Sequence, residues 1–146
     1  PAIGLVDLGL PTGTDFVGFE FWTKRSLGIV RDTLHAAAVD STFQVQVICL
    51  RPRLDHPQVL ATNRHVTCGG VDLLEVQWTD RTLSGTSDLV AGDGYELYLT
   101  EPAGFGAPTV VADGAEVVGN GVVGDVRVLR LMAGAGGRVR WSVRYR

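Results

Sequence analysis

The sequence predicts an all-β fold, an antiparallel β-sandwich of the Greek-key, immunoglobulin-like or jelly-roll-like kind with little or no helix. The first observation is composition: the 146 residues include 21 valines but three isoleucines, five glutamates and one lysine. Glutamate and lysine favour helix surfaces because they lose little side-chain freedom there. Valine and threonine favour strands, and aspartate and glycine favour turns. The residue choice therefore indicates strands joined by turns.

The second observation is an alternation of apolar and polar residues, which a strand with one buried face requires. In chain order the apolar stripes are Val17, Phe19 and Phe21; Phe43, Val45, Val47 and Cys49; Leu74, Val76 and Trp78; Tyr95, Leu97 and Leu99; and Val139, Trp141, Val143 and Tyr145. Residues 126–131 carry apolar side chains on both faces, so we expect this strand to be covered on both sides. The best helix candidate, around Leu34 to Val39, is short.

The third observation is that turn signals separate these stripes about every ten residues. They are Pro11–Gly13, Gly69–Gly70, Gly92–Gly94, Pro102–Gly104 and Gly134–Gly137. Short strands punctuated in this way are typical of an antiparallel sandwich.

Length and composition predict one domain over residues 1–146. With 45% apolar residues the chain can build a core, which argues against disorder and against a disulfide-dense miniprotein. No apolar run reaches the roughly 18–20 residues of a membrane span, and a net charge of −3 argues against nucleic acid as a partner. The chain opens on Pro1 without a leader, so we expect a module from a longer precursor, lacking one or more strands upstream.

Charge is segregated along the C-terminal half. Residues 82–125 hold seven acidic and no basic residues, whereas residues 126–146 hold six arginines and no acid. We expect cross-strand ion pairs between neighbouring strands. The alternative, an arginine face for an anionic polymer, is disfavoured because the neighbouring acids would cancel its field.

Two motifs resemble functional sites by letter alone. Gly119–Gly124 matches the G-x-G-x-x-G pattern, but the chain continues as a strand rather than a helix, so a hairpin is expected. Cys49 and Cys68 lack histidines at zinc-site spacing, and no metal or cofactor is expected. Cys49 lies on an apolar stripe and is read as a small buried residue, while a disulfide remains an alternative for a secreted protein.

The densest polar stretch runs from Asp55 to Thr67 and contains His56, Arg64 and His65. A hydrolase could use such side chains as a general base, its orienting acid and an oxyanion donor. The stretch has no nucleophile in a recognisable setting, however. The alternative is that these groups satisfy the backbone of a long loop or contact an adjoining domain.

Aromatic rings can serve as platforms for sugars, whose C–H faces stack on them. Trp78 and Trp141 fall in phase with valines, which predicts core positions. Trp22 follows Phe21 at the end of an expected strand and is the best candidate for an exposed platform.

Several segments together resemble a known family. They are Val6–Leu10, Asp15–Trp22, Leu27–Gly28, residues 45–52 and residues 55–67. These segments are similar to the antiparallel β-sandwich that follows the catalytic barrel in α-galactosidase (melibiase) type glycoside hydrolases, including bacterial members. The resemblance covers about residues 3–100.

The resemblance implies a non-catalytic accessory domain whose partner is the catalytic (β/α) barrel of the same precursor. The family's catalytic aspartates lie on that barrel, so no catalytic residue is carried over. Carbohydrate contact is expected at Trp22, His56, Arg64 and His65, in a secreted or periplasmic rather than cytoplasmic protein. Two alternatives remain, a free-standing carbohydrate-binding module and a small hydrolase using Asp55, His56 and His65.

Overall fold

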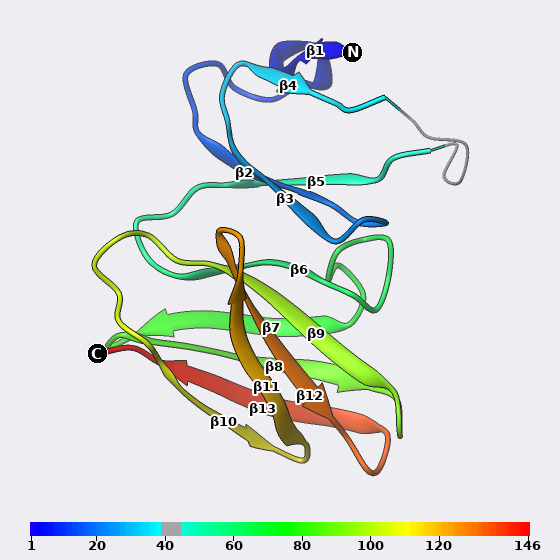
Figure 1. The fold of residues 1–146 in the computed structure, drawn as a ribbon, viewed down its shortest axis with the longest axis vertical. Coiled ribbons are helices and arrows are strands. Elements are labelled where there is room, and N and C mark those ends of the chain that lie inside the picture. Colours follow the sequence, from blue (N-terminus) through cyan, green and yellow to red (C-terminus); the bar gives the residue numbers. More distant parts are fainter. Residues whose placement is uncertain (39–44) are drawn as a thin grey trace. The chain divides into compact units, whose positions relative to one another are not determined.

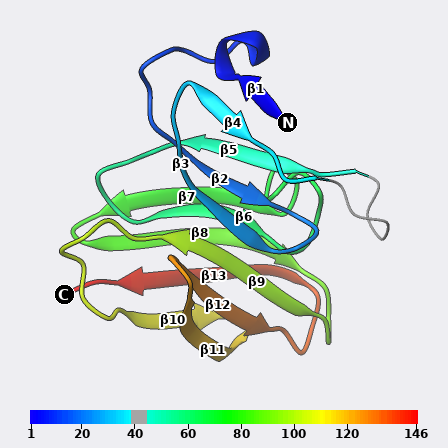
Figure 2. The same ribbon diagram turned by 45° about the horizontal axis from the view of Figure 1, so that its top comes forward.

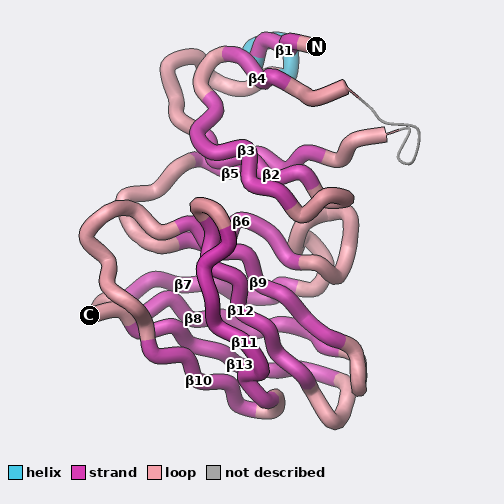
Figure 3. Tube along the Cα trace, in the orientation of Figure 1, coloured by secondary structure: helices cyan, strands magenta, loops and turns pink. Residues whose placement is uncertain are grey.

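The computed structural model describes residues 1–38 and 45–146, and the described residues form thirteen strands and one short 3₁₀ helix (Figures 1 and 3). Every strand pairing is antiparallel, which confirms the all-β prediction. The chain divides into two compact units, residues 1–53 and 54–146, and each is described by itself. Within the described residues, no helix is long and apolar enough to cross a membrane.

Unit 1 (residues 1–53) contains two small sheets. Its elements are β1 (Ala2–Gly4), the 3₁₀ helix η1 (Leu5–Leu8), β2 (Phe16–Glu20), β3 (Arg25–Val30), β4 (Thr33–His35) and β5 (Ile48–Pro52). β1 pairs with β4, and β2 lies between β3 and β5. Leu5, Phe16, Val30 and Leu34 form a buried cluster, against which Leu10, Leu27, Ile48 and Leu50 pack.

Two predictions for unit 1 were wrong, namely the solvent-facing side of the strand that carries Val17 and Phe19, and the phase of the apolar stripe over residues 43–49. All five residues of β2 are buried, so this strand has no solvent-facing side. In β5 it is Ile48 and Leu50 that pack on the cluster, whereas Val45 is exposed and Cys49 is half-buried. The buried positions of β5 are thus shifted by one residue from the predicted stripe, so the face of the strand opposite to the predicted one points into the core. Phe43 lies outside the described residues.

The segment that was the best helix candidate, around Leu34 to Val39, forms no helix over its described residues, in agreement with the expected scarcity of helix. Residues Thr33–His35 form β4, and Leu34 lies opposite Ile3 of β1 with its side chain buried. A helix of this length has little intrinsic stability, and pairing with β1 together with burial of Leu34 favours the strand. Val39 lies outside the described residues.

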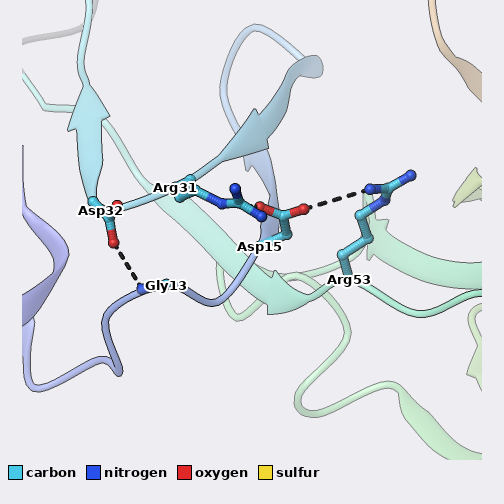
Figure 4. A network of polar contacts seen from close by, with 5 residues as sticks. All are labelled: Gly13, Asp15, Arg31, Asp32 and Arg53. Carbon is cyan, nitrogen blue, oxygen red and sulfur yellow. Dashed lines mark hydrogen bonds and ion pairs between the residues drawn. The ribbon is translucent and has the colours of Figure 1, made fainter.

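A polar network fastens the loop before β2 (Figure 4). Asp15 Oδ1 accepts a hydrogen bond from Arg31 Nε at 2.6 Å, and Asp15 Oδ2 lies 3.5 Å from Arg53 Nη1. Asp32 Oδ1 accepts from the backbone N–H of Gly13 at 2.8 Å. The loop is therefore tied to the β3–β4 turn and to the chain following β5.

Unit 2 (residues 54–146) is a two-layer antiparallel sandwich (Figures 1 and 2). One sheet has the order β10-β13-β8-β7 and the other the order β11-β12-β9-β6. The bounds are β6 (Gln58–Thr62), β7 (Leu73–Thr79), β8 (Thr82–Leu89), β9 (Gly94–Thr100), β10 (Thr109–Asp113), β11 (Glu116–Val123), β12 (Val126–Met132) and β13 (Gly137–Arg144). The sandwich prediction is confirmed here.

The stripes of the central strands of unit 2 are confirmed. The predicted apolar residues of β9 and β13 are all at most 3% exposed, and β12 is buried on both faces along most of its length. β7 differs, because it is an edge strand with a bulge between Leu73 and Glu75. A bulge interrupts the alternation, so Leu73 and Trp78 pack on the core while Leu74 and Val76 are exposed.

Two further predictions for unit 2 are confirmed. The Gly119–Gly124 segment lies in the β11–β12 hairpin. The segregated charges form ion pairs between neighbouring strands: Arg130 with Glu96, Arg140 with Asp113, and Arg127 with Glu101 at the end of β9. Directly opposite charges of this kind stabilise a sheet by modest amounts when exposed.

Candidate functional site

The candidate site is a pocket of about 210 Å³ in unit 1. It is formed by the turn between β2 and β3 and by the chain before and after residues 39–44. The described residues that line it are mostly apolar, and they are Glu20, Trp22, Thr23, Arg25, Leu27, Ala36, Ala37, Ala38, Val45, Gln46 and Ile48. Pockets for drug-sized ligands usually measure roughly 300–1,000 Å³, so this one suits a smaller molecule.

Glu20 organises the turn at the pocket. Its side chain accepts hydrogen bonds from the backbone N–H groups of Trp22 at 3.2 Å, Thr23 at 2.7 Å and Val47 at 3.4 Å, and from Thr23 Oγ1 at 2.5 Å. Burial by itself raises the pKa of Glu20, but these hydrogen bonds outweigh it, led by the Thr23 hydroxyl, and the pKa lies below its ordinary value. The carboxylate is thus committed to the fold rather than to a ligand.

The lowered pKa of Glu20 implies that this side chain stabilises the fold in a pH-dependent way. A depressed folded-state pKa stabilises the fold above the unfolded-state value of 4.5, and this stabilisation is lost as pH falls through the lower folded-state value. We expect Glu20→Gln to lower the free energy of unfolding by about 1–3 kcal/mol at pH 7, because the amide nitrogen cannot accept from Thr23. The difference should shrink as urea unfolding is repeated down to pH 3. Glu116→Gln, at an exposed position, is the control, and an equal loss at both pH values would contradict the prediction.

Trp22 stands at the rim of the pocket, with 37% of its surface exposed. Its ring meets the buried Phe21 ring edge to face, with the centroids 5.1 Å apart. Lys24 Nζ lies 3.5 Å from the centroid of Phe21. The indole therefore packs against a buried neighbour while part of it stays exposed at the pocket.

His56 lies elsewhere, in unit 2. Its ring stacks on Trp78 with the centroids 5.0 Å apart and the planes 1° from parallel, and Trp78 packs in turn on Phe105 and Tyr145. His56 Nδ1 lies 2.9 Å from the carbonyl oxygen of Pro57. These contacts make His56 part of an aromatic cluster of the fold.

Arg64 and His65 follow β6 in a loop stabilised by its own side chains. Arg64 Nη1 pairs with Asp93 Oδ2 at 2.5 Å, and His65 Nδ1 lies 3.1 Å from Thr67 Oγ1. Asn63 donates to the carbonyl of Gly94 and accepts from the N–H of Glu96. Within the described residues, Asp55 forms no hydrogen bond with either histidine. The structure thus does not join Asp55, His56 and His65 into an acid–base pair.

Cys49 and Cys68, both described, do not form a disulfide. Cys68 is buried, and its Sγ lies 3.7 Å from the carbonyl oxygen of Val66. Cys49 is half-buried rather than a core residue. Across the described residues, no cluster of three histidine, cysteine, aspartate or glutamate side chains could hold a metal ion.

Sequence reasoning missed a buried polar network inside unit 2. Asp72 Oδ2 accepts hydrogen bonds from Thr62 Oγ1 at 2.7 Å and from the Tyr95 hydroxyl at 2.8 Å. Ser87 Oγ lies 3.0 Å from the Tyr95 hydroxyl and accepts from Trp141 Nε1 at 3.0 Å. Burial, with the hydrogen bond to Asp72 adding to it, raises the pKa of Tyr95. The signal was present, because Tyr95 and Trp141 on apolar stripes each need a polar partner.

Sequence reasoning also missed two side chains of the pocket, Arg25 and Gln46. They stand 21 positions apart in the chain and belong to no motif. Comparison of the chain with protein-family models, with curated protein sequences and with solved structures found no match.

Proposed function

We propose that this chain is a non-catalytic accessory module of a glycoside hydrolase of the α-galactosidase type, and that it contacts carbohydrate through the unit 1 pocket. The resemblance of residues 3–100 supports the family. In this proposal the catalytic (β/α) barrel of the same precursor is the partner, and the parent protein is the enzyme. Trp22, rather than His56, Arg64 or His65, is the residue that would meet the sugar.

The observation that carries the proposal is the partly exposed indole of Trp22 beside a pocket of about 210 Å³. Carbohydrate sites combine an aromatic face for the sugar C–H groups with a few polar groups that fix its orientation. The pocket has both, because the Arg25 and Gln46 side chains line it together with Trp22. Its volume favours a single sugar ring.

Two alternatives have less support. A free-standing carbohydrate-binding module would use the same pocket and would differ in having no catalytic barrel in its precursor, which the parent gene would reveal. A small hydrolase built on Asp55, His56 and His65 is disfavoured because both histidines are engaged in local contacts.

The proposal predicts saturable sugar binding that depends on Trp22. We expect tryptophan fluorescence to change on titration with galactose, methyl galactosides and plant or algal polysaccharides. Trp22→Ala should weaken binding about tenfold, since a stacked aromatic contributes roughly 0.5–1.5 kcal/mol beyond the area that it buries.

Trp78→Phe is the matched control, because Trp78 packs in unit 2 and its replacement should leave the affinity unchanged. A flat response of the unmodified chain across all sugars would contradict carbohydrate contact. Turnover of a chromogenic galactoside by this chain, lost in His65→Ala, would overturn the accessory role in favour of the hydrolase.

A further inference from the structure

The unit 1 pocket can offer a ligand only a few side-chain polar groups from its described residues. The carboxylate of Glu20 already accepts four hydrogen bonds from the protein. The hydroxyl of Thr23 is engaged with that same carboxylate. The side chains of Arg25 and Gln46, in contrast, line the pocket without a hydrogen bond or ion pair to any described residue. What remains available among the described residues is therefore a guanidinium, which donates only, and an amide, which both donates and accepts.

The two charged residues among the described lining of the pocket, Glu20 and Arg25, differ in how far their charge is available to a ligand. Glu20 is 4% exposed, and its negative charge is shared among its four donors. Arg25 is exposed and belongs to the lining of the pocket, so its positive charge is not neutralised by burial or by an ion pair with a described residue.

We propose that the unit 1 pocket selects sugars that carry a carboxylate, that is, uronic acids. The inference rests on the proposed carbohydrate contact and adds the class of sugar. The ring stacks on Trp22, the guanidinium of Arg25 pairs with the carboxylate, and the amide of Gln46 bonds a hydroxyl. A planar guanidinium fits a carboxylate through two parallel hydrogen bonds, a geometry that a neutral hydroxymethyl group does not offer.

The test uses two ligands that differ at one carbon. Methyl α-galacturonide has a carboxylate where methyl α-galactoside has a hydroxymethyl group. In calorimetric titrations of the whole chain at neutral pH, we expect the uronide to bind at least about tenfold more tightly, the usual scale of a hydrogen bond to a charged group. This preference should fall as salt is raised, since Arg25 is exposed and its field is screened.

Arg25→Met should weaken binding of the uronide much more than binding of the galactoside, so that the roughly tenfold preference for the uronide is lost. Arg25→Lys should keep part of the preference, because it retains the charge without the planar fork. Arg138→Met, an exposed arginine of unit 2 without a described ion pair, is the matched control and should change neither affinity.

The outcomes separate the inference from the function on which it rests. Equal binding of the two glycosides, or an uronide preference that survives Arg25→Met, would overturn the inference and leave carbohydrate contact standing. Tighter binding of galactose 6-sulfate than of the uronide would overturn the assignment to a carboxylate. If neither glycoside binds, the proposed carbohydrate contact fails and the inference fails with it.

Discussion

Replacement of Gly85 by alanine is expected to lower the free energy of unfolding by about 3 kcal/mol, the upper range for forcing an extra carbon into a packed core. A Cβ atom at Gly85 would lie 2.4 Å from Trp141 Cζ2 and 2.5 Å from the carbonyl oxygen of Glu75. Neither atom can move away easily. Trp141 is 3% exposed and bonded to Ser87, and the carbonyl belongs to the backbone of the neighbouring strand β7.

Gly121→Ala is the matched control for Gly85→Ala. Gly121 also lies within a strand, but nothing stands within 4 Å of the Cβ that it would gain. We expect its effect to stay within about 0.5 kcal/mol, as for most surface substitutions. Urea unfolding followed by circular dichroism measures both variants. Equal stabilities of the two variants would contradict the prediction, because β7 and Trp141 would then have moved aside at little cost to make room for the added Cβ.

The second large effect concerns Glu101, which accepts from three donors at once. Its carboxylate lies 2.5 Å from Arg127 Nε, 3.1 Å from Arg127 Nη2 and 2.7 Å from the Tyr145 hydroxyl. The side chains of Arg127 and Glu101 are 10% and 16% exposed. Removing one member of a buried pair typically costs about 3–5 kcal/mol, because the other charge stays buried without its partner. For Glu101→Ala we expect a loss of about 3 kcal/mol.

Asp113→Ala is the comparison, because the side chains of Asp113 and Arg140 are 74% and 78% exposed. Exposed pairs contribute roughly 0–1 kcal/mol and are screened by salt. Denaturation at low and at high ionic strength should therefore show a large, salt-insensitive loss for Glu101→Ala and a small, salt-dependent one for Asp113→Ala. A loss for Glu101→Ala no larger than that for Asp113→Ala would contradict a role for the buried pair.

The sequence predicted the central strands of unit 2 better than the edges. β9 and β13 each have neighbours on both sides, and all their predicted core residues are buried, although Tyr98 on the other face of β9 is buried as well. β7 lies at an edge, and its bulge changes which side chains face inward. Such an extra residue depends on pairing with β8, and no local pattern in residues 73–79 reveals it.

The residues of the candidate site also differ in whether the sequence could reveal them. Trp22 could be identified because it ends a predicted strand next to Phe21, and it does lie at a pocket. Arg25 and Gln46 could not be identified, since only the folded chain brings them to that pocket. His56 and Trp78 are 22 positions apart, and their stacking also follows from the tertiary fold. Of the candidates that had a local signal, only Trp22 lies at the pocket, whereas His56, Arg64 and His65 do not. The pocket residues that meet through folding gave no local signal.

The polar network of Asp72, Tyr95, Ser87 and Trp141 spans the two layers of the sandwich, because Tyr95 belongs to β9 of one sheet while Ser87 and Trp141 belong to β8 and β13 of the other. An apolar interface is non-directional and by itself tolerates sliding of one layer over the other. Hydrogen bonds have narrow limits of distance and angle. If either sheet shifted by one residue, the Tyr95 phenol, the Trp141 indole N–H and the Ser87 hydroxyl would be buried without hydrogen-bond partners. The network therefore disfavours sliding of one sheet over the other and selects one relative position of the two sheets.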